Sequence, residues 1–326
     1  MNKSAMSVSL HATGRAFGLG KVAYQIWHRP VGKLRDVFTA GGPLEMRRTE
    51  RGRAAMEVAA YSLPELSGLN GPAPLELHVL TGRRFWYQTV FCLWTFARHS
   101  GRSLRPIIYD DGSLSEQFSA PLARLFPNAR FVSQEEIIDR LDVHLPVARY
   151  PALRERWVNY PNIRKLIDVH VGQPGWQLVI DSDLLFFRRP SLLIEWLESP
   201  TQPLHAVDCE TSYGYTRPLL DSLAGAPVAE LVNVGLTGLN GSELDWEKLE
   251  YWCRTLIQCE RTNYYLEQAL VAMLVAGGVC NIAPATDYVT LPRPPEAREC
   301  RAVMHHYVAN SKRWYFQHCW HVALRQ

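Results

Sequence analysis

Two carboxylates one residue apart, Asp181 and Asp183, directly follow a mostly apolar run at 176–180. Such a run is typical of a central parallel strand whose two faces are both covered. Because an unpaired carboxylate is very costly to bury, both acids should lie just past the carboxyl end of that strand, where open α/β sheets bind ligands. Two acids at this spacing offer oxygen ligands to Mn²⁺ or Mg²⁺, and such a cation commonly holds phosphates.

A third metal ligand must come from elsewhere, and the sequence offers His306 in the run His305-His306-Tyr307 near the C-terminus. Neutral imidazole binds metals of the manganese class. Lys312 follows six residues later and could neutralise a diphosphate as a point charge. By itself a histidine pair at a strand end is also compatible with an ordinary hydrogen-bonded structural role.

Other interpretations of the acid pair remain open at this point. Phosphatases of the haloacid dehalogenase type also place Asp-x-Asp after a strand, and Asp181 would then be the nucleophile. In those enzymes Thr or Val usually stands where this chain has Leu185, and the motif comes early, whereas here more than half of the chain precedes it. The acids could also simply cap the next element. A non-catalytic membrane or partner-binding module with a vestigial site is the third alternative.

The elements that must position these residues alternate regularly along the chain. Short apolar and β-branched runs alternate with longer helical patterns, which predicts an α/β fold with a doubly wound, mainly parallel sheet and helices on both faces. Strands are expected at 75–80, 106–109, 129–132, 176–180, 205–207, 232–236 and 301–305. Helices are expected at 85–99, 118–125, 135–141, 163–171, 246–257, 264–275 and 312–324.

Composition bounds the class of protein. The 326 residues are 47% hydrophobic and 21% charged, which is enough for a sizeable core. Seven cysteines without a Cys-x-x-Cys pair favour reduced thiols over a disulfide framework or a zinc site. No apolar stretch is long enough for a transmembrane helix, and the first residues do not resemble a signal peptide. We expect a cytoplasmic protein, either free or peripheral at the inner face of the membrane.

The N-terminal region is distinctly basic. Residues 1–60 contain ten Lys and Arg but four acids, whereas the formal net charge of the whole chain is only +3. Apolar residues recur at helical spacing between 19 and 38, so residues 15–40 could lie on an anionic membrane surface or pack on the rest of the protein. We therefore predict a basic, amphipathic helical extension at 1–61, a Pro- and Gly-rich linker at 62–74, and one α/β domain at 75–326.

Several motifs in this chain together resemble a known family, the retaining GT-A glycosyltransferases of the glycogenin and lipopolysaccharide galactosyltransferase type (family 8-like). That family has a strand ending in Asp-x-Asp, then Asn-x-Gly, then an Asp-Gln pair opening a helix, and finally His-Phe-x-Gly-x-x-Lys-Pro-Trp. The resemblance covers roughly residues 75–315 as spaced motifs in family order. The matching positions are Asp181 and Asp183; Asn233 and Gly235; Glu267 and Gln268; and His306, Tyr307, Lys312 and Trp314.

The resemblance implies a metal-dependent hexosyltransferase that moves a sugar from a nucleotide-diphosphate donor, a UDP-sugar, to a glycan, lipid or protein acceptor with retention of configuration. Asp181, Asp183 and His306 would hold Mn²⁺ or Mg²⁺, and Lys312 would contact the diphosphate. Stabilising charge on the departing phosphate is what a metal and a lysine do well. Arg164 matches a basic residue that reaches the diphosphate. No nucleic-acid partner is expected.

On the sugar side, the resemblance implies that Asn233, Glu267 and Gln268 line the donor sugar, with Gln268 offering its amide dipole beside the reacting carbon. Where the family has a base-contacting Asp after the first strand, this chain has Thr81-Gly82-Arg83-Arg84, and Thr81 is expected to bind the nucleotide. Two further groups have two interpretations each. Asp208 and Glu210 either face the acceptor or pair with an arginine, and Trp314, Tyr315 and Phe316 either stack on an acceptor sugar or belong to the core.

Overall fold

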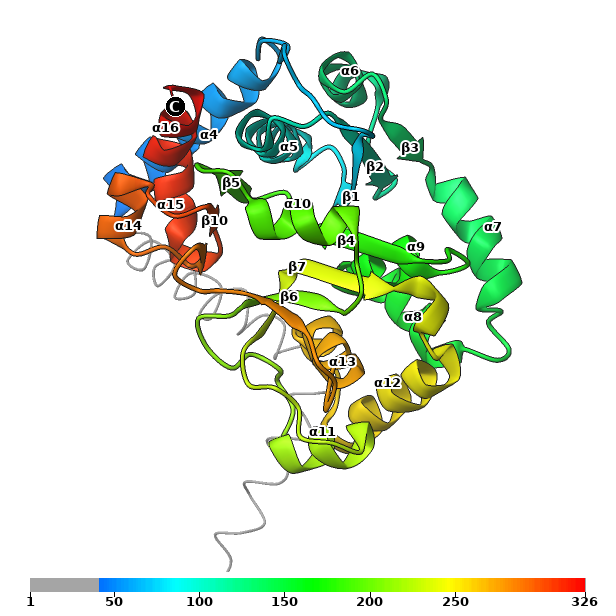
Figure 1. Ribbon diagram of the computed structural model, residues 1–326. Coiled ribbons are helices and arrows are strands. Elements are labelled where there is room, and N and C mark those ends of the chain that lie inside the picture. The colour runs from blue at the N-terminus through cyan, green and yellow to red at the C-terminus, as the bar shows by residue number, and fades with distance from the viewer. Residues whose placement is uncertain (1–40, 326) are drawn as a thin grey trace, which may run out of the picture.

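The computed structural model describes residues 41–325, which form a central seven-stranded sheet with helices on both faces (Figure 1). The strand order is β3-β2-β1-β4-β7-β6-β8. The bounds are β1 Leu75–Thr81, β2 Leu104–Asp110, β3 Arg130–Val132, β4 Trp176–Ile180, β6 Leu204–Val207, β7 Val232–Asn240 and β8 Asn281–Ala283.

The expected α/β fold with a mainly parallel sheet is confirmed. Strands β1, β2, β3 and β4 pair in parallel, and so do β6 and β8, whereas β7 is antiparallel to both β4 and β6. The sequence did not predict the reversed strand, because an apolar run covered on both faces looks the same in either direction. The antiparallel β7 brings Asn233, near its start, beside the carboxyl end of β4.

Successive side chains of the central strands alternate between two buried clusters. In β4, Leu178 and Ile180 face one cluster and Val179 faces the other. The first cluster is covered by α4 Pro43–Ala60, α5 Trp86–Ser100, α6 Glu116–Leu125, α10 Ser191–Glu198, α14 Pro294–Glu299 and the C-terminal helices. The second is covered by α7 Gln134–His144, α8 Pro151–Asn159, α9 Arg164–His170, α11 Arg217–Ala224, α12 Trp246–Glu260 and α13 Leu266–Leu274.

A second, three-stranded sheet follows the carboxyl end of β4. It consists of β5 Leu184–Phe186, β10 Met304–His306 and β9 Tyr288–Thr290. Strand β5 starts immediately after Asp183 and pairs antiparallel with β10, with Leu184 opposite His306. The backbone N–H of Tyr307 then donates to the Asp183 carbonyl at 3.1 Å. This register places a histidine that lies more than a hundred residues further along the chain directly beside the two acids.

The C-terminal segment differs from the single helix expected at 312–324. It consists of a short helix α15 Lys312–Trp314, a π-helical turn Tyr315–Cys319 and helix α16 Trp320–Arg325. Helix α4 packs against this segment (Figure 1). The contact is close at Gly52, where an added Cβ would lie 2.1 Å from the Phe316 carbonyl oxygen.

Residues 62–74 contain neither helix nor strand, and the Trp94 indole donates to the Pro64 carbonyl at 2.8 Å. The amphipathic segment expected between residues 15 and 40, with its choice between packing and membrane contact, lies outside the described residues. None of the helices within 41–325 has the length and apolar character needed to cross a bilayer.

Candidate active site

Asp181 and Asp183 lie in the turn between β4 and β5, as the apolar run before them predicted. The Asp181 backbone N–H donates to the Gly235 carbonyl at 2.8 Å, so the turn is tied to β7. Ligand atoms of Asp181, Asp183 and His306 all lie within 4.8 Å of one another. Two oxygens and one imidazole nitrogen form a set that suits a divalent cation of the manganese class.

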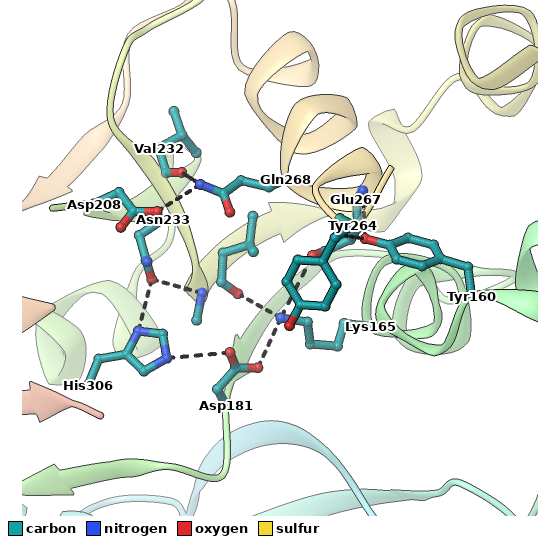
Figure 2. A network of polar contacts seen from close by, with 12 residues as sticks. Tyr160, Lys165, Asp181, Asp208, Val232, Asn233, Tyr264, Glu267, Gln268 and His306 are labelled. Atoms are coloured by element: carbon teal, nitrogen blue, oxygen red, sulfur yellow. Dashed lines mark hydrogen bonds and ion pairs between the residues drawn. The ribbon is translucent and has the colours of Figure 1, made fainter. Parts of the chain in front are cut away.

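The His306 ring is oriented by Asn233 (Figure 2). Nδ1 of His306 lies 3.2 Å from Oδ1 of Asn233, and the same oxygen accepts from the Gly235 N–H at 2.9 Å. In the neutral form that binds a metal, with its proton on Nδ1, the ring directs the Nε2 lone pair at Asp183 Oδ1 and Asp181 Oδ2, which lie 3.3 and 3.6 Å away. Buried Nε2 has no hydrogen-bond partner in the described chain. An orphaned nitrogen facing two carboxylates fits a metal ligand.

Gly235 makes this approach possible. An ideal Cβ at that position would lie 2.2 Å from Cε1 of His306, so any larger residue would push the ring away from the acids. The spacing Asn233-x-Gly235 therefore has a physical reason in this fold: the asparagine orients the imidazole and the glycine leaves room for it.

Two lysines flank the acids from opposite sides. Nζ of Lys165 lies 2.9 Å from Asp181 Oδ1 and 3.8 Å from Glu267 Oε2 (Figure 2). Nζ of Lys312 lies 3.0 Å from Asp183 Oδ2. Lys312 is the basic residue that the sequence indicated, whereas Lys165 was not foreseen. Helix α9 turns by about 100° per residue, so its neighbour Arg164 points elsewhere.

The ionisation of these groups is strongly coupled. Burial would lower the pKa of His306, but the two acids raise it, so without a metal the ring can also carry a proton on Nε2. Burial alone would raise the pKa of Asp183, but the protonated His306 and Lys312 outweigh it and hold that pKa well below its usual range. Burial would lower the pKa of Lys165, yet Asp181 and Glu267 raise it above its ordinary value. For Glu267, burial is the largest effect and raises the pKa to about 7, with only partial compensation from Lys165.

Glu267 and Gln268 lie in the first turn of helix α13, are buried, and line the same cavity as Asp181. Nε2 of Gln268 donates to Asp208 Oδ2 at 2.7 Å and to the Val232 carbonyl at 3.0 Å (Figure 2). Because both amide hydrogens are engaged, the amide oxygen is left for the cavity. Asp208 thus pairs with Gln268 and not with an arginine.

Thr81 and Arg164 lie on the other side of the acids, where both line a cavity. Thr81 is buried at the end of β1, and its hydroxyl accepts from Thr89 at 2.8 Å. Arg164 donates to Asp168 Oδ2 at 2.8 Å and to the carbonyls of Asp110 and Asp111 at 3.0 Å each. These contacts fix the turn after β2, and the role of Arg164 toward a diphosphate stays a prediction.

Two cavities meet at Asp181 and Lys165. The first, of about 360 Å³, is lined by Asn233, Glu267, Gln268 and His306 among others. The second, of about 260 Å³, extends from the two acids and Lys312 toward the ends of β1 and β2. Tyr264, 70% exposed, lines both. The arrangement offers one continuous site with a metal position at its centre.

A third cavity, of about 480 Å³, adjoins the first and shares Asp208 and Glu210 with it. Trp314 is half-buried and lines this cavity. Tyr315 and Phe316 are buried members of the core, which is the second of the two interpretations given for them.

The sequence matches no protein-family model, and no curated protein matches it at a significant level. Solved structures do match its fold. Mouse xyloside xylosyltransferase 1, in its apo form, is 13% identical with a TM-score of 0.50 over 73% of this chain and 99% of that chain. The expected GT-A-like fold is therefore confirmed.

Two further matches have lower TM-scores. The galactosyltransferase LgtC in complex with donor and acceptor sugar analogues is 15% identical, with a TM-score of 0.47 over 72% of this chain and 87% of that chain. The bifunctional glycosyltransferase WbbM in its apo structure is 11% identical, with a TM-score of 0.49 over 76% of this chain and 48% of that chain.

Proposed function

We propose that this protein is a metal-dependent glycosyltransferase that uses a nucleotide-diphosphate-sugar donor. The observation that supports this most directly is the cluster of Asp181, Asp183 and His306, with an orphaned imidazole nitrogen, between two cavities of a GT-A-like fold. A nucleoside on one side and a sugar on the other would place the diphosphate at the cluster.

The residues present fit a divalent cation. Asp181, Asp183 and His306 would hold Mn²⁺ or Mg²⁺, which when bound supplies positive charge for the oxygens of the departing diphosphate. Lys312, 3.0 Å from Asp183 Oδ2, adds a second positive charge at the same place. Charges that are fixed before the reaction stabilise the leaving group without reorganisation.

The chain's own groups on the sugar side have distinct tasks in this proposal. Gln268, held through Nε2 by Asp208 and Val232, presents its amide oxygen to the sugar carbon that becomes positively charged. Glu267 and Lys165 accept from and donate to sugar hydroxyls. Asn233 keeps His306 in its tautomer and lines the same cavity. We further infer that the sugar is transferred with retention and that the acceptor enters through the third cavity.

The phosphatase alternative fits the geometry less well. A nucleophilic carboxylate must reach phosphorus with a free oxygen. Oδ1 of Asp181 is paired with Lys165 at 2.9 Å, and Oδ2 faces His306 at 3.6 Å. Oδ1 of the proposed nucleophile is therefore already paired with a lysine, and Oδ2 faces the position at which we propose that the metal binds.

The test is a thermal-shift panel of nucleotide sugars with and without Mn²⁺, followed by donor turnover. We expect a metal-dependent shift with at least one nucleotide sugar, lost in Asp183→Ala and in His306→Ala. Asp139→Asn, an exposed carboxylate on α7, is the matched control and should behave as wild type. Absence of any shift across the panel, or phosphate release from phosphomonoesters without a sugar donor, would contradict the proposal.

A further inference from the structure

Two cysteines near the C-terminus lie against one another in the core. Cys300 directly follows helix α14, and Cys319 ends the π-helical turn. Both are free thiols, and Sγ of each lies 3.2 Å from the same carbonyl oxygen, that of Ala297. The two thiols are also hydrogen-bonded to each other. Their sulfurs are therefore placed where a bond between them needs little movement of either side chain.

The surroundings of the pair favour its oxidation. Hydrogen bonds from Cys300 and Tyr307 lower the pKa of Cys319, although burial opposes them. The thiolate is the reactive form of cysteine. Both sulfurs are buried, but the chain neighbours of Cys300, Glu299 and Arg301, are exposed, and helix α14 has only six residues. A small oxidant such as hydrogen peroxide can therefore reach the pair when this short helix opens locally.

The segment between the two cysteines, 301–318, contributes to every part of the proposed site. It contains His306, the candidate metal ligand, and Lys312, whose Nζ lies 3.0 Å from Asp183 Oδ2. Ala309 lines both the first and the third cavity. A bond between the two sulfurs would close this segment into a covalent loop.

The backbone of the segment and of its ends is unusual. Cys300 and Ala309 have φ values of 47° and 44°, in the left-handed region that residues other than glycine rarely adopt. Residues Tyr315–Cys319 form a π-helical turn, which is also rare and common at functional sites. Strained conformations persist only where the surrounding structure holds them. The segment therefore tends to open, and a covalent link between its ends would oppose that opening.

We propose that hydrogen peroxide converts Cys300 and Cys319 into a reversible disulfide, which restricts opening of the segment 301–318. The sulfur of Cys319 attacks one peroxide oxygen, the O–O bond breaks, and one water leaves, so that Cys319 becomes a sulfenic acid. The sulfur of Cys300 then displaces the hydroxyl group, which leaves with the Cys300 proton as a second water. The two sulfurs are oxidised, and the peroxide is reduced to water. A dithiol reductant reverses the step.

Peptide mapping of the full chain without reductant, after brief treatment with hydrogen peroxide, tests the site. Trypsin should release Cys300 in the peptide 299–301 and Cys319 in the peptide 314–325, because arginines bound both. We expect these two peptides to be joined by a disulfide in the treated protein and to separate after dithiothreitol. Recovery of both cysteines as free thiols, or as sulfinic acids without any linked peptide, would overturn the proposal.

Hydrogen exchange followed by mass spectrometry tests the consequence for the segment. In the oxidised protein we expect amides within 301–318 to exchange at least about 10-fold more slowly than in the reduced protein, because linked ends leave fewer open states. Helix α12, which covers the second buried cluster, should exchange equally in both forms. Equal exchange of 301–318 in the two forms would also overturn the proposal.

Cys319→Ser is the direct variant, because a serine hydroxyl can still donate to the Ala297 carbonyl. We expect it to lose both the linked peptide and the effect of peroxide on exchange. Cys253→Ser changes a buried cysteine of the second cluster and is the matched control, which should keep both. Slower exchange of 301–318 in peroxide-treated Cys319→Ser would assign the effect to another modification and refute the disulfide.

This proposal and the proposed function fail in different ways. Peptide mapping and hydrogen exchange need neither metal nor nucleotide, so a negative result there leaves the transferase function standing. Absence of any shift in the panel of nucleotide sugars would refute the transferase function and leave the disulfide unaffected.

Discussion

The amide of Asn233 makes three scattered side chains one candidate metal site. It accepts from the Gly235 N–H and fixes the His306 ring through Nδ1, so Nε2 faces both acids. We predict that Asn233→Ala lowers the affinity for Mn²⁺ by about 10- to 100-fold, the usual effect of removing such a supporting contact. Calorimetric titration with Mn²⁺ alone measures this directly.

Asn240, at the far end of the same strand, is the matched control. Its side chain contacts Ser242 and Glu243, away from the acids, so Asn240→Ala should leave the affinity for Mn²⁺ unchanged. Equal metal affinity in wild type and Asn233→Ala would show that the ring is held by its other surroundings.

Glu267 gives the metal-free protein a predictable response to pH. Burial raises its pKa from 4.5 to about 7. Because the folded pKa is the higher one, the stability it contributes is fully present below pH 4.5 and is lost as the pH rises through 7. The loss approaches about 1.4 kcal/mol for each pH unit between the two pKa values. We predict that Glu267→Gln makes the melting temperature less dependent on pH between 5 and 8.

Melting curves in the presence of a chelator measure this effect without interference from metal. Glu135→Gln, on the exposed side of α7, serves as the control and should keep the slope of the wild type. An identical slope in Glu267→Gln and wild type would mean that Lys165 keeps the carboxylate ionised throughout that range.

At the scale of elements, the contact between α4 and the π-helical turn Tyr315–Cys319 should reverse the usual effect of replacing a helical glycine by alanine. Gly→Ala inside a helix normally stabilises a protein by about 0.5–1 kcal/mol. At Gly52 the new Cβ would meet the Phe316 carbonyl oxygen at 2.1 Å. We predict that Gly52→Ala destabilises the fold by about 1–3 kcal/mol, as overpacking does. Urea unfolding monitored by circular dichroism gives the difference.

Ala54→Gly supplies the comparison, since residue 54 is exposed on the same helix. It should lose about 0.5–1 kcal/mol, as an ordinary helical position does. Stabilisation in Gly52→Ala would mean that α4 can shift away from the C-terminal segment at little cost.

The longer elements were predictable from sequence, but the exact bounds and the pairing of the short strands were not. The strand that leads to Asp181 was visible because its apolar run is continuous, and α5 because its pattern extends over four turns. Strand β5 has three residues, too few for a periodic signal, and was not expected, whereas β10, equally short, overlaps the strand expected at 301–305 only at its end. The pairing of β5 with β10 sets the distance between His306 and the two acids. The family resemblance indicated His306 as the third candidate ligand, and this register is the structural reason why it lies beside the acids.

The direction of side chains on short helices was the second feature that the sequence did not predict. Arg164 and Lys165 are adjacent and both basic, but only Lys165 contacts Asp181. Arg164 instead fixes the backbone after β2. Which of two neighbours on a helix faces a site depends on how the helix rotates against the sheet, and a seven-residue helix gives too short a pattern to determine this rotation.

For the molecule as a whole, the charge of the site is balanced before any metal binds. Lys165 pairs with Asp181, and Lys312 pairs with Asp183. We therefore predict that the chelator-treated protein stays folded and melts cooperatively. Added Mn²⁺ should stabilise it by mass action alone, by about 2.7 kcal/mol at 100 times the dissociation constant.

Near-UV circular dichroism in the presence of a chelator tests whether the metal-free protein is folded. Melting curves with and without Mn²⁺ measure the stabilisation by the ion. Asp183→Ala should be folded and insensitive to Mn²⁺. Loss of the near-UV signal on chelation would show that the fold needs the ion.

The pairing of β5 with β10 also has a consequence for how the protein is made. Strand β5 follows Asp183 directly, but its partner Met304–His306 is synthesised more than a hundred residues later. A nascent chain that stops before residue 304 contains both acids and lacks the imidazole that completes the set. The proposed set of metal ligands is therefore complete only after residue 306 has been synthesised, and we expect fragments that stop before β10 to bind Mn²⁺ weakly or not at all.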